Sequence, residues 1–213
     1  SGKHDKFAII PVPMGPALKT EMPEIEEFVR FADAGDMLIR ANGKEFTEKD
    51  FYFADSTVFN VFTHAFLMGS PEKCLTESNT IVLTESTAKK YFGNENPMGK
   101  FVKDIEGNDF IVSAIIEDNI DNSHLKFDGL ISIPTIIEAY GRENFNTFEA
   151  GAFWNIGVFG YIMLKENSSI SSIYDKFPAF YDKYMKSVGD QVNASFNLMT
   201  RPLADIHLTS DLG

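Results

Sequence analysis

Two segments concentrate the side chains whose oxygens could bind a metal ion. Residues 117–124 read Glu-Asp-Asn-Ile-Asp-Asn-Ser-His, and residues 104–109 read Asp-Ile-Glu-Gly-Asn-Asp. Such oxygens suit Ca²⁺, but neither segment has the full pattern of spaced acids, central glycine and terminal glutamate of an EF-hand loop. Asp and Asn side chains also stabilise turns by bonding to nearby backbone. We therefore interpret both segments as turns.

The histidines and the cysteine do not form a recognisable metal site. No two of His4, His64, His124 and His207 have the i, i+4 or short-loop spacing of zinc ligands. We predict a structural or surface role for each of them. Cys74 is the only cysteine, which excludes an internal disulfide and a cysteine metal cage, and we interpret it as a buried, inert thiol.

Signatures of catalysis are missing from the sequence. It has no Gly-x-Ser-x-Gly elbow, no glycine-rich phosphate loop and no carboxylate pair whose placement supports acid–base chemistry. We predict no catalytic residues, no metal ligands, no cofactor and no cofactor-binding residues.

A run of aromatic residues is the one feature that could carry binding. Large aromatic side chains usually build a core, and we favour that interpretation. The alternative is an exposed apolar patch that binds a partner or a hydrophobic cargo. Six aromatic residues fall within 16 positions: Phe51, Tyr52, Phe53, Phe59, Phe62 and Phe66.

Composition indicates a folded, acidic protein. The 213 residues are 44% hydrophobic, enough for one large or two small domains. The formal net charge of −12 argues against nucleic acid or anionic lipid as a partner, because both require clustered Lys and Arg. No stretch approaches the roughly 18 consecutive apolar residues of a membrane span. Residues 1–4, which begin Ser-Gly without a methionine, are interpreted as a cleavage remnant and a disordered start.

The elements that would position the side chains follow from periodicity and turn residues. Residues 81–83 are a strand-type apolar run, and a helix capped by Thr84 or Ser86 should follow and end at Gly93. Asn42-Gly43 is the strongest hairpin signal, because both residues accept positive φ angles.

The two ends of the chain give weaker patterns. Residues 7–12 suit an edge strand, residues 14–16 a turn, and Pro23 followed by Glu24, Glu26 and Glu27 predicts a helix. Ser168 or Ser169 should open a long helix that Pro178 kinks or divides. Strands over residues 154–164 and 196–208 would flank that helix.

The sequence of one segment resembles a motif of a known protein family. Thr80-Ile-Val-Leu-Thr-Glu-Ser-Thr-Ala-Lys-Lys-Tyr-Phe-Gly93, closed by Asn96-Pro-Met-Gly-Lys100, is similar to a phrase in the extracytoplasmic core domain of MacB/FtsX-type ABC transporter permeases. The hairpin expected from Lys100-Phe-Val102 through Glu106-Gly-Asn108 to residues 110–116 also fits that family. Three further passages resemble it in the same order: residues 51–69, residues 128–134 and residues 201–209.

The resemblance implies an α+β fold with a discontinuous organisation. A porter-like lobe of strands and two main helices would comprise residues 5–70 and 128–213. A smaller, sabre-like α/β lobe would be inserted at residues 71–127.

The resemblance also implies a function without catalysis in this domain. The domain would lie on the periplasmic side of the inner membrane, anchored by helices outside the given sequence, and would transmit ATP-driven conformational change. Implied partners are an ABC ATPase subunit or domain, a second permease copy, and a periplasmic adaptor or lipoprotein. The exported substrate stays unnamed. The alternative from another class is a secreted acidic hydrolase or solute-binding domain whose pocket is the aromatic cluster.

Overall fold

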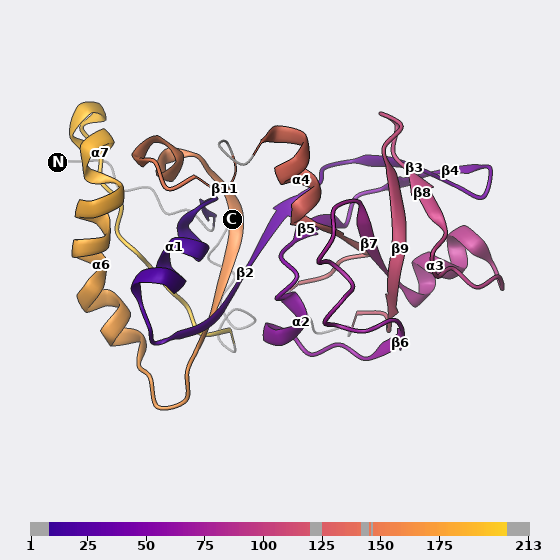
Figure 1. The fold of residues 1–213 in the computed structure, drawn as a ribbon, viewed down its shortest axis with the longest axis horizontal. Coiled ribbons are helices and arrows are strands. Elements are labelled where there is room, and N and C mark those ends of the chain that lie inside the picture. The colour runs from indigo at the N-terminus through magenta and orange to yellow at the C-terminus, as the bar shows by residue number, and fades with distance from the viewer. Residues whose placement is uncertain (1–8, 120–124, 142–144, 146, 204–213) are drawn as a thin grey trace. The chain divides into compact units, whose positions relative to one another are not determined.

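The chain divides into two compact units in the computed structural model, which describes residues 9–119, 125–141, 145 and 147–203 (Figure 1). Unit 1 consists of Ser1–Phe28 and Asn146–Gly213, and unit 2 consists of Val29–Phe145. The second unit is therefore inserted into the first in sequence. The predicted insert covers residues 71–127, so the compact unit of the structure begins earlier and ends later. Assignment of the units as porter-like and sabre-like lobes stays a prediction, and residues 1–4 lie outside the described part.

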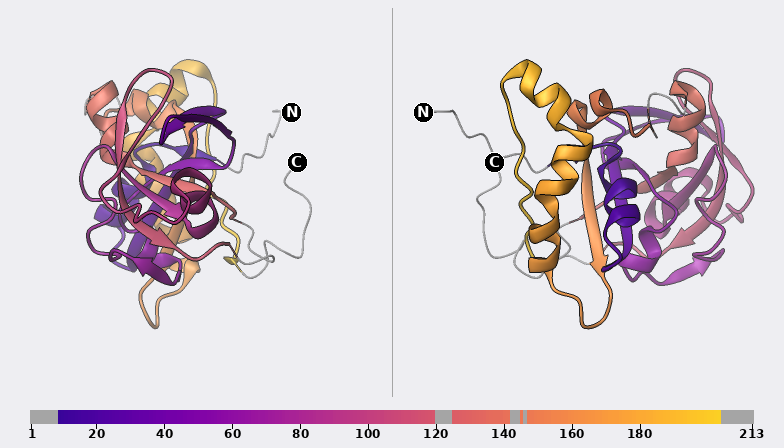
Figure 2. Two further views of the ribbon diagram at one scale, coloured as in Figure 1. Left: turned by 90° about the vertical axis from the view of Figure 1, so that its right-hand side faces the viewer. Right: turned by 60° about the vertical axis from the view of Figure 1, so that its left-hand side comes forward.

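Unit 1 is a small sheet with helices packed on it. Strand β1 (Ile10–Pro11) pairs antiparallel with β11 (Ile156–Leu164), and β2 (Ile25–Asp33) follows β11 in the strand order. The boundary with unit 2 falls inside β2. The helices are α1 (Met14–Glu21), α6 (Ile170–Tyr184), α7 (Lys186–Val192) and the 3-10 helix η1 (Ala150–Trp154) (Figures 1 and 2).

Aromatic rings hold α6 in unit 1. Ile173, Phe177, Phe180 and Tyr184 recur at helical spacing and are buried, so one face of α6 is apolar. The ring of Tyr184 stacks on that of Phe153 in η1 with centroids 5.0 Å apart, and Phe180 meets Phe153 edge to face at 5.8 Å. Such ring pairs contribute about 0.5–1.5 kcal/mol each beyond the area that they bury.

Unit 2 is built on a mixed sheet. Its strand order is β2-β5-β10-β7-β9-β8-β3-β4, and β6 pairs with β9. The central strand β7 (Thr80–Thr84) is parallel to β9 (Asp109–Ile116) and antiparallel to β10 (Gly129–Ser132), which is parallel to β5 (Phe51–Ala54). The remaining elements are β3 (Met37–Ala41), β4 (Lys44–Glu48), α2 (Val58–Val61), β6 (Phe66–Met68), α3 (Glu85–Phe92), β8 (Phe101–Lys103) and α4 (Ile133–Tyr140).

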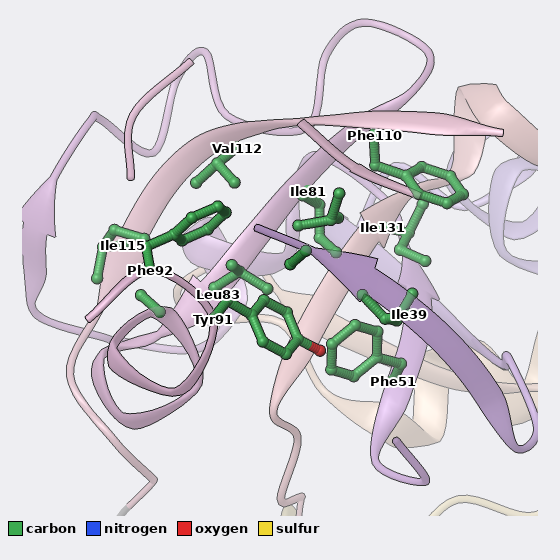
Figure 3. Close-up of a cluster of buried hydrophobic side chains, with 13 residues drawn as sticks. Ile39, Phe51, Ile81, Leu83, Tyr91, Phe92, Phe110, Val112, Ile115 and Ile131 are labelled. Atoms are coloured by element: carbon green, nitrogen blue, oxygen red, sulfur yellow. The ribbon is translucent and has the colours of Figure 1, made fainter. Parts of the chain in front are cut away.

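Strand β7 is at the centre of the unit 2 core. All five of its residues are buried, as expected for a strand covered on both faces. Helix α3 lies in the connection between the parallel strands β7 and β9, because parallel neighbours require a crossover. The buried cluster between these elements is drawn in Figure 3 and includes Ile39, Phe51, Ile81, Leu83, Tyr91, Phe92, Phe110, Val112, Ile115 and Ile131.

The α+β class and the two strongest local patterns are confirmed. Thr84, rather than Ser86, is the N-cap of α3, and its side chain accepts a hydrogen bond from the backbone N–H of Thr87. Gly93 ends the helix at a φ of 62°. In the β3–β4 hairpin, Asn42 and Gly43 have φ angles of 49° and 74°.

The helix predicted at the first glutamate cluster is wrong. Residues 25–33 form strand β2, in which Ile25, Val29 and Phe31 are buried. Apolar residues at positions 25 and 29 suit either period, and the β-branched type of both favours the strand. The turn predicted at residues 14–16 is instead the start of α1, where Pro16 does no harm because first-turn N–H groups have no partner within the helix.

Two predictions near the C-terminus also differ from the structure. Ser169 caps α6 as expected, but the helix continues through Pro178 to Tyr184, so Pro178 does not divide it, and the alternative, a kink, stays a prediction. Pro178 is exposed, so water can bond the carbonyl that the proline leaves without a donor. Strand β11 confirms the strand at residues 154–164 from Ile156 onward, whereas residues 196–203 form no strand, and residues 204–208 lie outside the described part.

The hairpin turn yields a stability prediction with a matched control. A Cβ added at Gly43 or at Gly157 meets nothing within 4 Å, but only Gly43 has a positive φ. Gly43→Ala should lower the free energy of unfolding by about 1–2 kcal/mol, because an L side chain disfavours the left-handed region. Gly157→Ala should leave it unchanged or raise it by up to about 1 kcal/mol. Urea denaturation of the purified domain measures both, and equal effects would contradict the turn geometry.

Candidate functional site

Described acidic side chains of the two oxygen-rich segments accept hydrogen bonds from the protein itself: Asp104 within its own turn, and Asp118 from the start of α3. In residues 104–109 the Asp104 carboxylate accepts hydrogen bonds from the backbone N–H and the side-chain amide of Asn108, at 2.9 and 2.7 Å. In residues 117–124, of which 120–124 lie outside the described part, Asp118 accepts from the backbone N–H of Ser86 at 2.9 Å. Among the described residues no group of three His, Cys, Asp or Glu side chains could hold a metal ion.

The described histidine and the cysteine are both in apolar surroundings. His64 lies between the rings of Phe59 and Phe127, with centroids 5.9 and 5.4 Å away, and burial lowers its pKa. Cys74 is fully buried and forms no disulfide, and burial raises the pKa of its thiol to about 11. A thiol that stays protonated at neutral pH is a poor nucleophile. The other predicted surface or structural histidines, His4, His124 and His207, lie outside the described residues.

The aromatic run packs inward rather than forming an exposed patch. Phe51 is fully buried in the core of unit 2, the other five aromatic residues are half-buried, and none of the six is among the exposed large hydrophobics. The Phe59 ring meets that of Phe66 edge to face at 4.8 Å, and Phe62 meets Phe31 at 5.9 Å. This packing supports the core interpretation over a binding patch.

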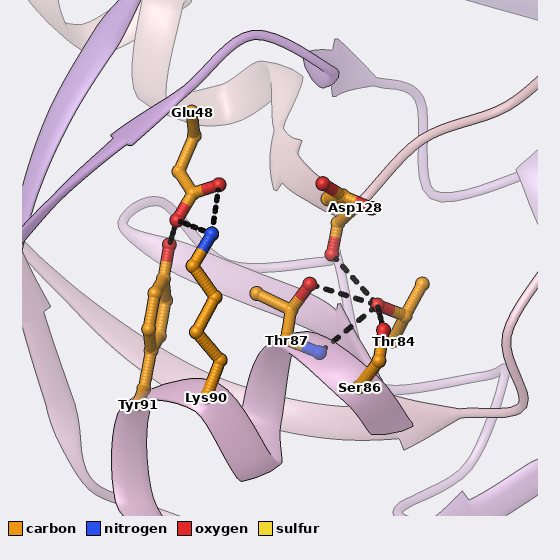
Figure 4. A network of polar contacts seen from close by, with 7 residues as sticks. All are labelled: Glu48, Thr84, Ser86, Thr87, Lys90, Tyr91 and Asp128. Carbon is orange, nitrogen blue, oxygen red and sulfur yellow. Dashed lines mark hydrogen bonds and ion pairs between the residues drawn. The ribbon is translucent and has the colours of Figure 1, made fainter.

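A buried carboxylate in unit 2 was not anticipated from the sequence. Glu48, the last residue of β4, is 2% exposed. Figure 4 shows its carboxylate facing two neighbouring residues of α3. The Lys90 ammonium and the Tyr91 hydroxyl each donate to it at 2.7 Å. Both carboxylate oxygens therefore have partners, as a buried charge requires.

The N-terminal end of α3 is held by a second set of contacts. The backbone N–H of Thr84 donates to the carbonyl of Asp128, just before β10, at 3.1 Å. The Thr84 hydroxyl caps the helix and lies close to the hydroxyls of Ser86 and Thr87 (Figure 4). The backbone N–H of Asp128 in turn donates to the carbonyl of Asp50 at 2.8 Å. Helix α3 is thus fixed at its start to the residue that precedes β10 and near its end to β4.

The network is suited to fixing a helix rather than to proton transfer. Burial, followed by the hydrogen bond to Glu48, raises the pKa of Tyr91, so its hydroxyl stays a neutral donor. Burial, followed by the nearby charges of Asp50 and Glu48, raises the pKa of Asp128. A general acid or base must reach a substrate within hydrogen-bond distance, and the Glu48 carboxylate is already enclosed by its two donors. We name these seven residues of Figure 4 the α3 anchor: Glu48, Thr84, Ser86, Thr87, Lys90, Tyr91 and Asp128.

One signal for the α3 anchor was present in the sequence. Tyr91 lies on the apolar face of the predicted helix, and a buried tyrosine hydroxyl usually needs a hydrogen-bond partner. Its partner is 43 positions away in the chain, however, and only the sheet order brings β4 within reach of α3. The sequence therefore indicates that a partner exists but does not identify Glu48.

The α3 anchor yields a prediction about stability. Tyr91→Phe should lower the free energy of unfolding by about 1.5–3 kcal/mol, because it removes a hydrogen bond to a buried charged group. The loss should be smaller in a Glu48→Gln background, where the acceptor is neutral. Glu45→Gln is the control, since its pair with Arg40 is more than half exposed on both sides and should contribute at most about 1 kcal/mol. An ordinary surface substitution changes the free energy of unfolding by about 0.5 kcal/mol or less. A Tyr91→Phe effect no larger than that would contradict the stabilising role of the α3 anchor.

Comparison with solved structures shows a recurring fold. The structure is similar to a domain assigned to a permease protein of Porphyromonas gingivalis, with a TM-score of 0.75 and 18% identity over 96% of this chain and 88% of that one. It is similar to the periplasmic region of MacB from Actinobacillus actinomycetemcomitans, with a TM-score of 0.58 and 15% identity over 88% and 85% of the two chains.

A third similar structure comes from Gram-positive bacteria. It is the extracellular domain of the noncanonic ABC-type transporter YknZ, with a TM-score of 0.56 and 12% identity over 92% of this chain and 91% of that one. No curated protein matches the sequence. In the described part of the chain, every helix is too short or too polar to cross a membrane.

The sequence itself provides the family. Residues 3–179 match the family model of the MacB-like periplasmic core domain, which is well over half of the 213 residues. This agrees with the resemblance carried by residues 80–100 and with the α+β fold of the similar structures. The chain therefore belongs to the family of MacB-like periplasmic core domains, which are parts of ABC transporter permeases.

Proposed function

We propose that this periplasmic domain of a MacB/FtsX-like permease transmits conformational change, driven by ATP hydrolysis elsewhere in the transporter, to the periplasm. Family membership provides the transporter context. The observation that carries the mechanical role is the α3 anchor, which fixes the helix of the β7–β9 crossover to β4 at Glu48 and to Asp128 just before β10. A domain that passes on movement must resist deformation, and buried, fully paired polar groups oppose it because each costs free energy if left unpaired.

The free energy needed to switch a transporter between two states requires a stiff periplasmic domain. To move a two-state arrangement from mostly one state to mostly the other takes about 5.5 kcal/mol of differential free energy. If the periplasmic domain yielded under that load, the change would be absorbed locally. Strand β7 is buried along its whole length and has a neighbouring strand on each side, and so close-packed a core resists small deformations.

The proposal includes partners and location. In the whole permease, membrane helices flanking the domain would anchor it to the inner membrane and connect it to an ABC ATPase subunit or domain. A second permease copy would provide the surface against which the domain moves. An adaptor protein or a lipoprotein is the proposed periplasmic partner, and the class of exported substrate is left open.

We also infer that the domain has no catalytic activity of its own. The buried charges of Glu48 and Arg30 are paired with Lys90 and Asp55, and the cysteine is protonated and enclosed. The rival interpretation, a secreted hydrolase or solute-binding domain, would need an accessible pocket at the aromatic cluster. The inward packing of Phe51 and its neighbours weighs against that pocket.

A distance measurement in the full-length permease tests the proposal. Asn94 is exposed just after α3, so Asn94→Cys with a spin label reports on the domain. In nanodiscs containing the permease and its ATPase, the distance between labels on two copies should change when ATP and vanadate are added. An ATPase variant that does not bind ATP should abolish the change.

Two results would count against the proposal. An identical distance distribution with and without nucleotide would contradict transmission to the periplasm. Turnover of ester, peptide or glycoside substrates by the purified domain would instead support the hydrolase interpretation, and we expect none.

A further inference from the structure

The segment that follows α7 in unit 1 is extended but belongs to no sheet. Asn193 ends α7 with a φ of 53°, and the chain then runs back alongside α6 (Figures 1 and 2). In residues 194–200 burial alternates along the chain: Phe196, Leu198 and Thr200 are half-buried, and the residues between them are exposed. We call residues 194–200 the strap.

Two tyrosine hydroxyls of α6 hold the ends of the strap. Tyr181 donates to the carbonyl of Ala194 at 3.2 Å. The backbone N–H of Thr200 donates to the hydroxyl of Tyr174 at 2.9 Å, and the hydroxyls of Tyr174 and Thr200 lie 2.5 Å apart. Tyr174 and Tyr181 are about two helical turns apart, so they lie on one face of α6. This face of the helix therefore bonds backbone groups at both ends of an extended segment.

Apolar contacts hold the middle of the strap. The centres of the Phe196 and Trp154 rings are 4.8 Å apart, and both Phe196 and Leu198 pack against the buried cluster of unit 1. Trp154 also donates from Nε1 to the carbonyl of Met185 at 3.1 Å. This bond does not involve the strap, so it fixes the indole ring independently of the segment that covers it.

The strap is held less firmly than the helix beneath it. Within the described part of the chain, no hydrogen bond reaches the backbone of residues 195–199. Tyr174 is 38% exposed, so water has access to its bond with Thr200. Segments with few buried contacts and exposed bonds open at a much smaller free energy than the whole domain. Helix α6 is fixed separately, because Phe177 and Phe180 are buried on its other contacts.

We propose that the strap detaches from unit 1 as one segment while α6 stays folded, and that its release uncovers a binding site for an extended segment of a partner protein. The strap itself shows what the site accepts: apolar side chains at alternate positions, with backbone groups at both ends bonded by Tyr174 and Tyr181. An extended chain presents alternate side chains on one side, which gives such a site its selectivity. The inference concerns the isolated domain, so its failure would leave the proposed function standing.

Hydrogen exchange at the Thr200 amide tests whether the strap detaches as one segment. Tyr181→Phe removes the bond at the opposite end of the strap and leaves that of Thr200 in place. In the purified domain, measured by NMR, it should make Thr200 exchange about twofold to tenfold faster. Phe196→Ala should make it about threefold to tenfold faster, because a half-buried ring is lost. Asn197→Ala is the control, since this neighbouring side chain is exposed and should have no effect.

A peptide with the sequence of residues 194–200 tests the uncovered site. Binding of the fluorescently labelled peptide to the purified domain is followed by fluorescence anisotropy. Only the released form can bind it, so Phe196→Ala should raise its affinity by the same factor by which it speeds Thr200 exchange. A peptide of the same composition, with its phenylalanine and leucine made adjacent, should bind about threefold to tenfold more weakly, because one of the two side chains then faces water.

The two halves of the proposal can each be overturned. Amides in the middle of α6 should keep their protection in every variant, and their loss would show that the helix does not stay folded. Thr200 exchange that responds to neither Tyr181→Phe nor Phe196→Ala would overturn release as one segment. Equal peptide affinity for Phe196→Ala and the wild type, despite faster Thr200 exchange, would overturn the binding site.

Discussion

The need to pair a buried carboxylate shapes unit 2. Glu48 ends strand β4 at 2% exposure, and its charge is tolerated only because Lys90 and Tyr91 reach it from the same turn of α3. This requirement sets where α3 lies along the sheet, and α3 belongs to the crossover that makes β7 and β9 parallel neighbours. The position of α3 on the central strands is therefore consistent with two stabilising features: the contact of Glu48 with Lys90 and Tyr91, and the apolar core of unit 2.

A second buried charge imposes a further constraint within unit 2. The Arg30 guanidinium bonds the Asp55 carboxylate through two N–H groups, and its carbon lies 5.5 Å from the centre of the Phe145 ring. One side chain of β2 therefore contacts both the segment after β5 and the last residue of the unit. The α3 anchor and this ion pair thus act on different elements of unit 2.

Local signals in the sequence predicted local structure well. The Asn42-Gly43 turn, the Thr84 cap and the Gly93 stop each depend on one residue's backbone preference, and all three are confirmed. The segment after Pro23 shows where such reasoning fails. Ile25 and Val29 fit a helix face and a strand face equally, and pairing with distant strands decides between them. Tertiary context overrides a local pattern in such cases.

Long-range features were not available from the sequence. The partner of Tyr91 lies 43 positions away, and that of Arg30 lies 25 positions away, so neither pair has a spacing that a motif could reveal. At residues 196–203 a strand was predicted where the structure has none. Their alternation suggested a strand, but no neighbouring strand pairs with them within the described residues. Instead the backbone N–H of Thr200 donates to the hydroxyl of Tyr174 in α6.

The central claim is that unit 2 moves as a stiff body while the transporter changes state. Hydrogen exchange of the full-length permease with its ATPase, compared between nucleotide-free and ATP-bound states, tests this most directly. The account predicts that amides of β7, β9, β10 and α3 keep the same protection in both states. Loss of protection in α3 or β7 in either state would show that the domain deforms, and would contradict the account.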